Sequence, residues 1–352
     1  MRALVLSGGE GSRLRPLTHT NAKQLIPVGG RPILFSALDA IRDARITEVG
    51  IVVGSTADEV RAAVGDGAAW DLSVTYIPQE APLGLAHAVL TARDFVAGEP
   101  FLMYLGDNLL LEGVARFVEE FERTRPDAQI FLARVPEPEH FGVAVLEGDR
   151  VVRLVEKPKA HVSDFALVGV YLFDDSILEA CATLKPSWRN EYEITEAIQW
   201  LIDHGRTVRA EMVTGWWKDT GRPEDLLEAN RMMLSVQPGE VLGEVDRAST
   251  LSGAVVLAAG AKVIRSEIRG PAVIGADSVV EDSVVGPNVS IERDCTVSRS
   301  SIDDSIVMEG CTIDDVRGVS GSILGKNVEL GHSGRTGVRR LIVGDQSRLE
   351  VD

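Results

Sequence analysis

The sequence predicts an α/β domain with a mostly parallel sheet, followed by a second domain that forms a parallel β-helix. Two periodicities lead to this prediction. Up to about residue 235, short β-rich runs alternate with amphipathic helical patterns, as in parallel sheets that helices cover on both faces. Beyond that point aliphatic residues recur at steps of six residues, occasionally five. Neither a helix nor an alternating strand gives this step, which is typical of hexapeptide repeats.

The first domain is expected over residues 1–235 and opens with an apolar strand at residues 3–6. Further strand candidates are Val49–Val53, Val74–Ile77, Phe101–Leu105, Gln129–Val135, Val143–Leu146, Val151–Val155, Leu167–Phe173 and Val208–Val213. Helical patterns fit Ile33–Ala44, Leu85–Phe95, Val114–Phe121, Ile194–His204 and Glu224–Leu234. Because ligands of such sheets bind outside the carboxyl ends of the strands, functional residues are expected directly after them.

The second domain is expected over residues 251–352, after a connector at residues 236–250 that contains Pro and Gly. The aliphatic positions of its repeat are Ile268, Ile274, Val280, Val285, Ile291, Val297, Ile302, Val307, Ile313, Val319, Leu324 and Leu330. Each repeat buries little apolar surface by itself, so the stacked coils have to supply the core of this domain.

The composition excludes several classes of protein. A net charge of −17 opposes binding to nucleic acid, which requires a basic surface. No apolar run approaches the ~20 residues of a membrane-spanning helix, and the first one is too short for a secretory signal. Three scattered cysteines suggest neither a metal site nor a disulfide framework. We therefore expect a cytoplasmic protein without nucleic-acid or membrane partners.

The segment after the first strand has the features of a phosphate-binding loop. It reads Ser-Gly-Gly-Glu-Gly-Ser-Arg-Leu-Arg-Pro-Leu-Thr from Ser7, and Lys-Gln-Leu-Ile-Pro-Val follows from Lys23. Glycines let the backbone approach a ligand closely, and exposed N–H groups after a strand bind anions. Leu14 is too large for the dinucleotide fingerprint, and the P-loop tripeptide Gly-Lys-Ser/Thr is absent from the sequence. Arg13 and Lys23 add positive charge, so we expect a loop that holds polyphosphate.

Two aspartates at strand ends could hold a metal ion. Asp107 follows the strand candidate at 101–105, and Asp219 lies in Trp-Trp-Lys-Asp-Thr-Gly from Trp216. Taken singly, the first could be a turn residue and the second part of a helix-capping segment. Together with a phosphate loop, however, they meet the needs of Mg²⁺, which takes one or two protein carboxylates and completes its coordination with phosphate and water.

The pattern Gly-Gly-x-Gly-Ser/Thr-Arg-Leu-x-Pro-Leu-Thr followed by Lys-Gln-Leu-x-Pro-Val resembles the sugar-nucleotide pyrophosphorylases. Within them the chain is most similar to glucose-1-phosphate thymidylyltransferases, in the long form with a C-terminal left-handed β-helix. The resemblance covers essentially the whole chain. It implies a Rossmann-like (GT-A-like) nucleotidyltransferase domain, dTTP and glucose 1-phosphate as substrates, and Mg²⁺ as cofactor.

The same resemblance implies roles for individual residues. Arg13, Lys23 and Lys157 would be catalytic, and Asp107 and Asp219 would bind the metal ion. The nucleotide-binding residues would be Leu6, Gly8, Gly9, Gly11, Ser12, Arg13, Gln24, Gln79, Gly84 and Asp107. Glucose hydroxyls would bind Gly142, Glu156, Gly169 and Glu191, and the sugar phosphate would bind Lys157 and Arg189. Gln24 favours thymine over uracil, since uridylyl relatives more often carry Pro or Glu at that position.

Three alternatives remain open from the sequence. The chain could be a UTP-dependent uridylyltransferase, or a bifunctional enzyme whose β-helix transfers an acetyl group with the help of His332. It could also be a regulatory subunit, although such subunits tend to lose the charged residues that are present here. We further expect a homo-oligomer, associated through the β-helix, the catalytic domain or both, because flat stacked coils favour symmetric self-association.

Overall fold

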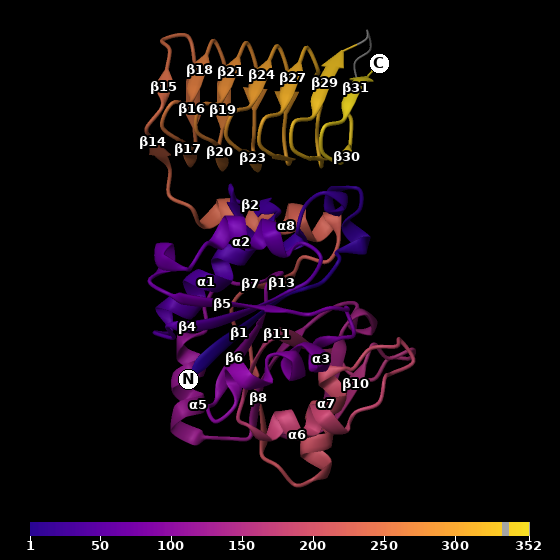
Figure 1. Ribbon diagram of the computed structural model, residues 1–352. Coiled ribbons are helices and arrows are strands. Elements are labelled where there is room, and N and C mark those ends of the chain that lie inside the picture. The colour runs from indigo at the N-terminus through magenta and orange to yellow at the C-terminus, as the bar shows by residue number, and fades with distance from the viewer. Residues whose placement is uncertain (333–337, 352) are drawn as a thin grey trace. The chain divides into compact units, whose positions relative to one another are not determined.

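The computed structural model describes residues 1–332 and 338–351 (Figure 1). They form two compact units. The first contains Met1–Glu10 and Leu34–Asp219, and the second contains Gly11–Ile33 together with the chain from Thr220 onward. This division differs from the boundary that the sequence indicates near residue 235, because segment 11–33 groups with the C-terminal part of the chain.

A mixed sheet forms the centre of the first unit. Within its described residues, nine strands lie in the order β5-β4-β1-β6-β11-β8-β12-β10-β9. Parallel pairs join β1 to β4 and β6, β4 to β5, and β8 to β12, whereas β11 runs antiparallel to both β6 and β8. The bounds are β1 (Arg2–Ser7), β4 (Glu48–Val53), β5 (Ser73–Pro78), β6 (Phe101–Leu105), β8 (Ala128–Arg134), β9 (Gly142–Glu147), β10 (Arg150–Glu156), β11 (Phe165–Phe173) and β12 (Val208–Met212). The β-rich runs of the sequence therefore become these strands, parallel around β1 and mixed beyond β6.

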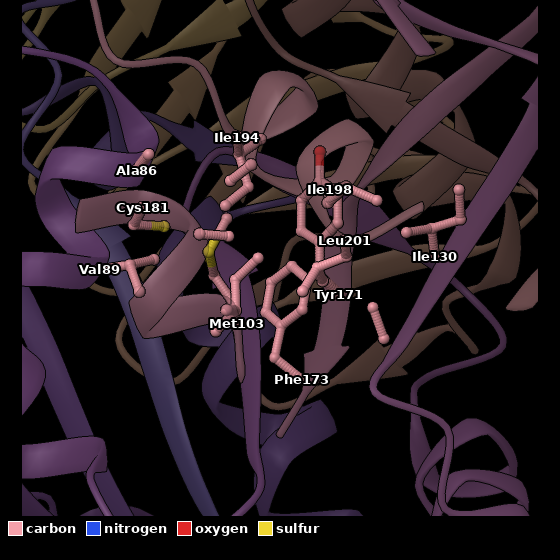
Figure 2. Close-up of a cluster of buried hydrophobic side chains, with 14 of the residues drawn as sticks. Ala86, Val89, Met103, Ile130, Tyr171, Phe173, Cys181, Ile194, Ile198 and Leu201 are labelled. Carbon is pink, nitrogen blue, oxygen red and sulfur yellow. The ribbon is translucent and has the colours of Figure 1, made fainter. Parts of the chain in front are cut away.

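Helices complete the first unit: α1 (Ile33–Asp43), α2 (Ala57–Val64), α3 (Leu85–Thr91), α4 (Arg93–Val96), α5 (Ala115–Thr124), α6 (Ser176–Thr183) and α7 (Ile194–Asp203), with short 3₁₀ turns at Ala68–Trp70 and Pro138–His140. The helix expected at 85–95 is divided into α3 and α4 at Ala92. Residues of α3, α6 and α7 pack on one face of the sheet against β6, β8 and β11 (Figure 2). The labelled members of this core are Ala86, Val89, Met103, Ile130, Tyr171, Phe173, Cys181, Ile194, Ile198 and Leu201.

Two short strands lie outside the large sheet. β7 (Asn108–Leu110) and β13 (Trp217–Asp219) pair in antiparallel fashion, with Asp219 opposite Asn108. The sequence does not predict this pair, because three residues give no readable periodicity.

The second unit is built on three sheets of stacked parallel strands, drawn from orange to yellow in Figure 1. The first sheet contains β14 (Glu240–Val241), β17 (Val255–Leu257), β20 (Ala272–Ile274), β23 (Val289–Ile291), β26 (Ile306–Val307), β28 (Ile323–Leu324) and β30 (Ile342–Val343). The second contains β15 (Glu244–Val245), β18 (Lys262–Ile264), β21 (Val279–Glu281), β24 (Thr296–Ser298), β27 (Thr312–Asp314), β29 (Glu329–His332) and β31 (Arg348–Val351). The third contains β16 (Thr250–Ser252), β19 (Glu267–Arg269), β22 (Val284–Val285) and β25 (Ser301–Ile302).

These sheets form the predicted β-helix. Ile274 pairs with Ile291 and Val280 with Val297, so that one coil takes 17 residues, or three steps of about six. Each aliphatic position predicted from the repeat is at most 2% exposed. The first strands, β14 and β15, already lie in the segment expected as a connector. His332 ends β29, and the residues that follow it, 333–337, lie outside the described part of the chain.

Segment 11–33 and helix α8 (Pro223–Val236) pack against the outer face of the first β-helix sheet. The segment contains three 3₁₀ turns, η1 (Ser12–Leu14), η2 (Leu17–His19) and η3 (Lys23–Leu25), and the pair β2 (Pro27–Val28) and β3 (Arg31–Pro32). Asn230 of α8 is buried, and its Oδ1 accepts hydrogen bonds from the Gly29 N–H and the Ser290 hydroxyl, both at 2.8 Å. The side-chain amide of Asn230 thus links segment 11–33, helix α8 and the β-helix.

No helix in the described residues has the length and apolar character needed to cross a membrane. The thiols of Cys181, Cys295 and Cys311 are free and buried.

Candidate active site

The carboxyl end of β1 leads into the glycine-rich loop. Leu6 and Ser7 are buried, and Gly8 follows them. A Cβ atom on Gly8 would lie 3.1 Å from Gln79 Oε1, and one on Gly54 would lie 2.7 Å from the Gly8 carbonyl oxygen. The backbone at this strand end is therefore packed too closely for side chains, as the sequence predicts for a loop that approaches a ligand.

Gln79 follows β5 and is fixed from the side of helix α3. Its Nε2 donates to the Gly84 carbonyl at 3.4 Å and lies 2.9 Å from His87 Nδ1. With Nε2 as donor, His87 Nδ1 is the acceptor, and Gln79 Oε1 faces Gly8. Gly84 has φ +103°, and a Cβ there would meet the Tyr192 carbonyl oxygen at 2.5 Å. The amide thus presents an acceptor beside the glycine loop.

The two aspartates lie at the ends of two paired short strands. Asp107 is 7% exposed and directly precedes β7, while Asp219 ends β13 opposite Asn108. Asn108 Oδ1 accepts hydrogen bonds from the Gly169 N–H at 3.2 Å and from Trp217 Nε1 at 2.7 Å. A Cβ on Gly169 would lie 2.6 Å from Asn108 Cγ, so glycine leaves the room that this amide occupies.

The donor set fits a hard divalent cation that shares its coordination with substrate. Among residues 1–332 and 338–351, no three His, Cys, Asp or Glu side chains form a metal-binding group. Asp107 and Asp219 supply two carboxylates, which is the usual protein share for Mg²⁺ when phosphate oxygens and water complete the octahedron.

A third cluster gathers at the end of β10, at the start of β9, and in the first turn of α7 and the residues before it. Thr195 Oγ1 donates to Glu156 Oε2 at 3.1 Å, and Lys157 Nζ lies 3.9 Å from Glu156 Oε1. A Cβ on Gly142 would come within 2.5 Å of Thr195 Cγ2 and 3.1 Å of Glu156 Oε2. Burial raises the pKa of Glu156, and this effect outweighs the opposing effects of Lys157, Thr195 and Arg189.

Arg189 lies among three carboxylates of this cluster. Its guanidinium nitrogens are 2.8 Å from Glu191, 3.3 Å from Glu193 and 3.4 Å from Glu156. Glu193 is 4% exposed, and burial and then the Glu156 charge raise its pKa, despite a hydrogen bond from Ser187. The residues Gly142, Glu156, Lys157, Arg189 and Glu191, assigned to the sugar phosphate from sequence, are thus brought together here.

Of the remaining predicted residues, Gly9 lies in the first unit and the others belong to the second. Gly11 has a left-handed φ of 62°, its carbonyl accepts from Thr18 Oγ1 at 2.8 Å, and a Cβ on it would lie 3.0 Å from Lys23 Cβ. Ser12 and Arg13 are exposed in η1, whereas Gln24 in η3 is 1% exposed. In the described structure Gln24 Oε1 has no hydrogen-bond partner, an arrangement that leaves an acceptor for a ligand or water.

Sequence reasoning missed Asn108, His87, Glu193 and Thr195. Their neighbours were found, since Asn108 follows Asp107 and Thr195 lies two residues after Glu193 in the motif that contains Glu191. Each owes its position to contacts across 8 to 109 residues or to burial, which a local pattern does not show.

A separate hollow of about 890 Å³ lies over α5, β8 and β12, and none of the predicted site residues lines it. Its walls carry arginines and carboxylates that pair with one another, such as Arg116 with Glu211 at 3.3 Å and Arg209 with Glu120 at 3.4 Å. Because the converging groups of the proposed chemistry lie elsewhere in the unit, we do not place the active site here.

Comparison with known proteins identifies the family of the chain. A profile described as nucleotidyl transferase matches residues 2–236. The chain belongs to the nucleotidyl transferase family. This family member is 51% identical over 353 residues to a glucose-1-phosphate thymidylyltransferase of Streptomyces griseus, covering 100% of this chain and 99% of the relative. It is 47% identical, with the same coverage, to the protein of that name from Streptomyces antibioticus.

A solved structure is also similar to this nucleotidyl transferase. It is a crystal structure described as a glucose-1-phosphate thymidylyltransferase from Bacillus anthracis in complex with sucrose. The TM-score is 0.64 at 34% identity, over 68% of this chain and 98% of that one. The likeness therefore covers the length of a nucleotidyl transferase domain.

Proposed function

We propose that the chain transfers a thymidylyl group from dTTP to glucose 1-phosphate and releases pyrophosphate. The observation that carries this proposal is the gathering, within the first unit, of a fixed amide beside a glycine-rich strand end, a carboxylate pair and an acidic cluster with a lysine. Full-length relatives named for the same reaction support it.

The amide of Gln79 favours a pyrimidine with a ring N–H. Its Nε2 donates hydrogen bonds to the Gly84 carbonyl and to His87 Nδ1, which leaves Oε1 to accept a hydrogen bond from the base. Thymine and uracil offer the N3–H that such an acceptor requires, whereas cytosine carries an acceptor at N3. The buried Oε1 of Gln24 supplies a second acceptor for the nucleotide.

The reaction requires no strong general base on the protein. The second pKa of a phosphate monoester is about 6, so that glucose 1-phosphate is a dianion at neutral pH. Its oxygen attacks the α-phosphorus of dTTP in line, the P–O bond to the β-phosphate breaks, and pyrophosphate leaves with the bonding electron pair. Two anions have to be held together while charge moves to the leaving group.

Each charged residue has a part in that task. Lys157 binds the attacking phosphate, while Arg13 and Lys23 neutralise the triphosphate. The carboxylates of Glu156 and Glu191 accept hydrogen bonds from glucose hydroxyls. The backbone of Gly142 and Gly169 binds hydroxyls of the same sugar. Nucleotidyltransferases of this kind generally use a divalent metal. We propose Mg²⁺, which Asp107 and Asp219 would hold and which would neutralise phosphate charge when bound.

The decisive experiment is pyrophosphate release with glucose 1-phosphate and Mg²⁺, with dTTP, UTP, CTP, ATP and GTP tested singly. The proposal expects a clear preference for dTTP, while a preference for UTP would move the chain to the uridylyl class. Asp107→Ala should remove most turnover without unfolding the protein. Turnover like that of the wild type at saturating Mg²⁺ would contradict the metal assignment.

We further propose that the chain is a cytoplasmic homo-oligomer. The stacked strands offer flat surfaces suited to symmetric association. Light scattering at micromolar concentration tests this, and a monomer there would overturn it.

A further inference from the structure

The last coil of the β-helix is bonded to the segment that carries Arg13 and Lys23. Asp345 follows β30, and its Oδ2 accepts a hydrogen bond from Thr20 Oγ1 at 2.7 Å. Asn21 Nδ2 lies 3.0 Å from Oδ1 and 2.9 Å from Oδ2 of the same carboxylate. Thr20 and Asn21 are the two residues that separate turn η2 from Ala22 and turn η3.

The carboxylate itself is held firmly in place. Its Oδ1 also accepts the Lys326 N–H at 2.8 Å, from the neighbouring coil. A Cβ on Gly325 would lie 2.6 Å from Asp345 Oδ1, and one on Gly344 would lie 3.2 Å from the Pro16 carbonyl oxygen. Gly325 thus allows the neighbouring coil to approach Asp345 closely, and Gly344 allows the last coil to approach Pro16.

The contact continues toward the phosphate-binding loop. Asn21 is 7% exposed, and its Nδ2 also donates to the Leu17 carbonyl at 3.2 Å, which fixes the end of η2. Within and after η2, Thr18 bonds to the Gly11 carbonyl and Lys23 packs against Gly11. Asp345 therefore holds the residues after η2, which lie between the turn that contains Arg13 and the turn that contains Lys23.

We infer that Asp345 is a positioning residue for nucleotidyl transfer, through which the β-helix sets the backbone that carries Arg13 and Lys23. This inference rests on the proposed function. A cationic side chain stabilises charge on the triphosphate only when held in place, and a displacement of about 1 Å can cost on the order of 100-fold in rate. The chain already has a net charge of −17, and a further carboxylate near this segment repels a bound polyphosphate. The evident role of Asp345 is therefore to accept the hydrogen bonds from Thr20 and Asn21.

The test compares Asp345→Ala with Asp345→Asn and with the control Asp277→Ala. Asp277 is a turn aspartate of another coil whose Oδ1 likewise approaches a glycine, Gly260, of the adjacent coil. The expected result for Asp345→Ala is a fall in kcat/KM for dTTP on the order of 10-fold or more, with the KM for glucose 1-phosphate changed less than about twofold. Asp345→Asn should restore most of the rate, because its amide oxygen still accepts from Asn21. Asp277→Ala should keep the rate of the wild type.

Hydrogen exchange gives a second readout that needs no turnover. Amides of residues 11–25 should exchange faster in Asp345→Ala and remain protected in Asp277→Ala. Unchanged exchange there, or unchanged kcat/KM for dTTP in Asp345→Ala, would overturn the inference, as would an equal loss of rate in both alanine variants. A wild-type chain inactive with every nucleotide would instead contradict the proposed function, and the exchange comparison would still decide whether Asp345 holds the segment.

Discussion

At the scale of single residues, the surroundings of Arg189 matter more than its place in a motif. Its guanidinium already faces Glu156, Glu191 and Glu193 at 2.8 to 3.4 Å. A phosphate approaching it has to compete with three anions, whereas Lys157 Nζ lies farther from its carboxylate neighbour, 3.9 Å from Glu156 Oε1. Phosphate binding should therefore depend more on the lysine, and Arg189 should mainly neutralise the acidic cluster.

Lys157→Gln is expected to raise the KM for glucose 1-phosphate about 10- to 100-fold, the range of a charge-assisted hydrogen bond. Arg189→Gln should raise it less and should lower the melting temperature, because buried Glu193 then loses its cation. Steady-state kinetics and thermal unfolding of the two variants measure this. The reverse order of KM values would contradict it.

The carboxyl of Glu156 should make both substrate binding and stability depend on pH. Burial raises the pKa of this carboxyl above its ordinary value of 4.5. The ionised form accepts hydrogen bonds from hydroxyls at both oxygens, whereas protonation turns one oxygen into a donor, so the KM for glucose 1-phosphate should rise as the pH falls through that raised pKa. The free energy of unfolding should depend on pH in the opposite direction. The stability that the neutral carboxyl contributes is fully present below pH 4.5 and is lost as the pH rises through the folded-state pKa.

The variant Glu156→Gln separates this titration from that of the substrate phosphate, whose pKa is about 6. We expect a flatter dependence of KM on pH in the variant, with only the substrate's titration left. A KM profile identical in shape to that of the wild type would remove Glu156 from the site.

His87 predicts an effect on base selection. Because it accepts from Gln79 Nε2, His87→Ala should free the amide to rotate and lower the preference for dTTP over CTP by about tenfold, the equivalent of one hydrogen bond. Thr91→Ala, on the same helix, is the control, since Thr91 bonds only to the His87 carbonyl in the described structure. Competition assays with both nucleotides measure the ratio, and equal ratios in the two variants would contradict this role.

At the scale of elements, the sequence predicts what periodicity determines and misses what pairing determines. The strand at Phe101–Leu105 and the aliphatic positions of the β-helix are confirmed, because a continuous apolar run marks the first and a regular step of buried positions marks the second. β7 and β13 are too short to show a period, and their pairing joins residues 109 apart. The candidate site follows the same rule: motif residues can be proposed from the sequence, whereas the positions of Asn108 and Glu193 depend on partners distant in sequence or on burial.

Asn108→Ala tests the short strand pair as an element. The change leaves the Gly169 N–H and Trp217 Nε1 without their acceptor, which should cost about 1–3 kcal/mol of unfolding free energy. Urea denaturation followed by tryptophan fluorescence measures the loss. An unchanged midpoint would show that β7, β11 and β13 do not depend on this amide.

At the scale of the whole molecule, the β-helix core is one continuous stack, in which each coil covers the next. Ile291 lies in its middle and is fully buried. Ile291→Ala should cost about 2–5 kcal/mol through the cavity that it creates, whereas Thr296→Ala on the outer surface should change little. Denaturant unfolding followed by circular dichroism compares the two, and equal midpoints would contradict the stacked core.

The bond between Thr20 and Asp345 spans 325 residues of chain. During synthesis, at about 5–20 residues per second, the first of these residues is made roughly 16 to 65 seconds before the second. Over that time the glycine-rich loop has no last coil to bind. A nascent or prematurely terminated chain therefore cannot complete this contact, and only a chain translated to its last coil acquires it.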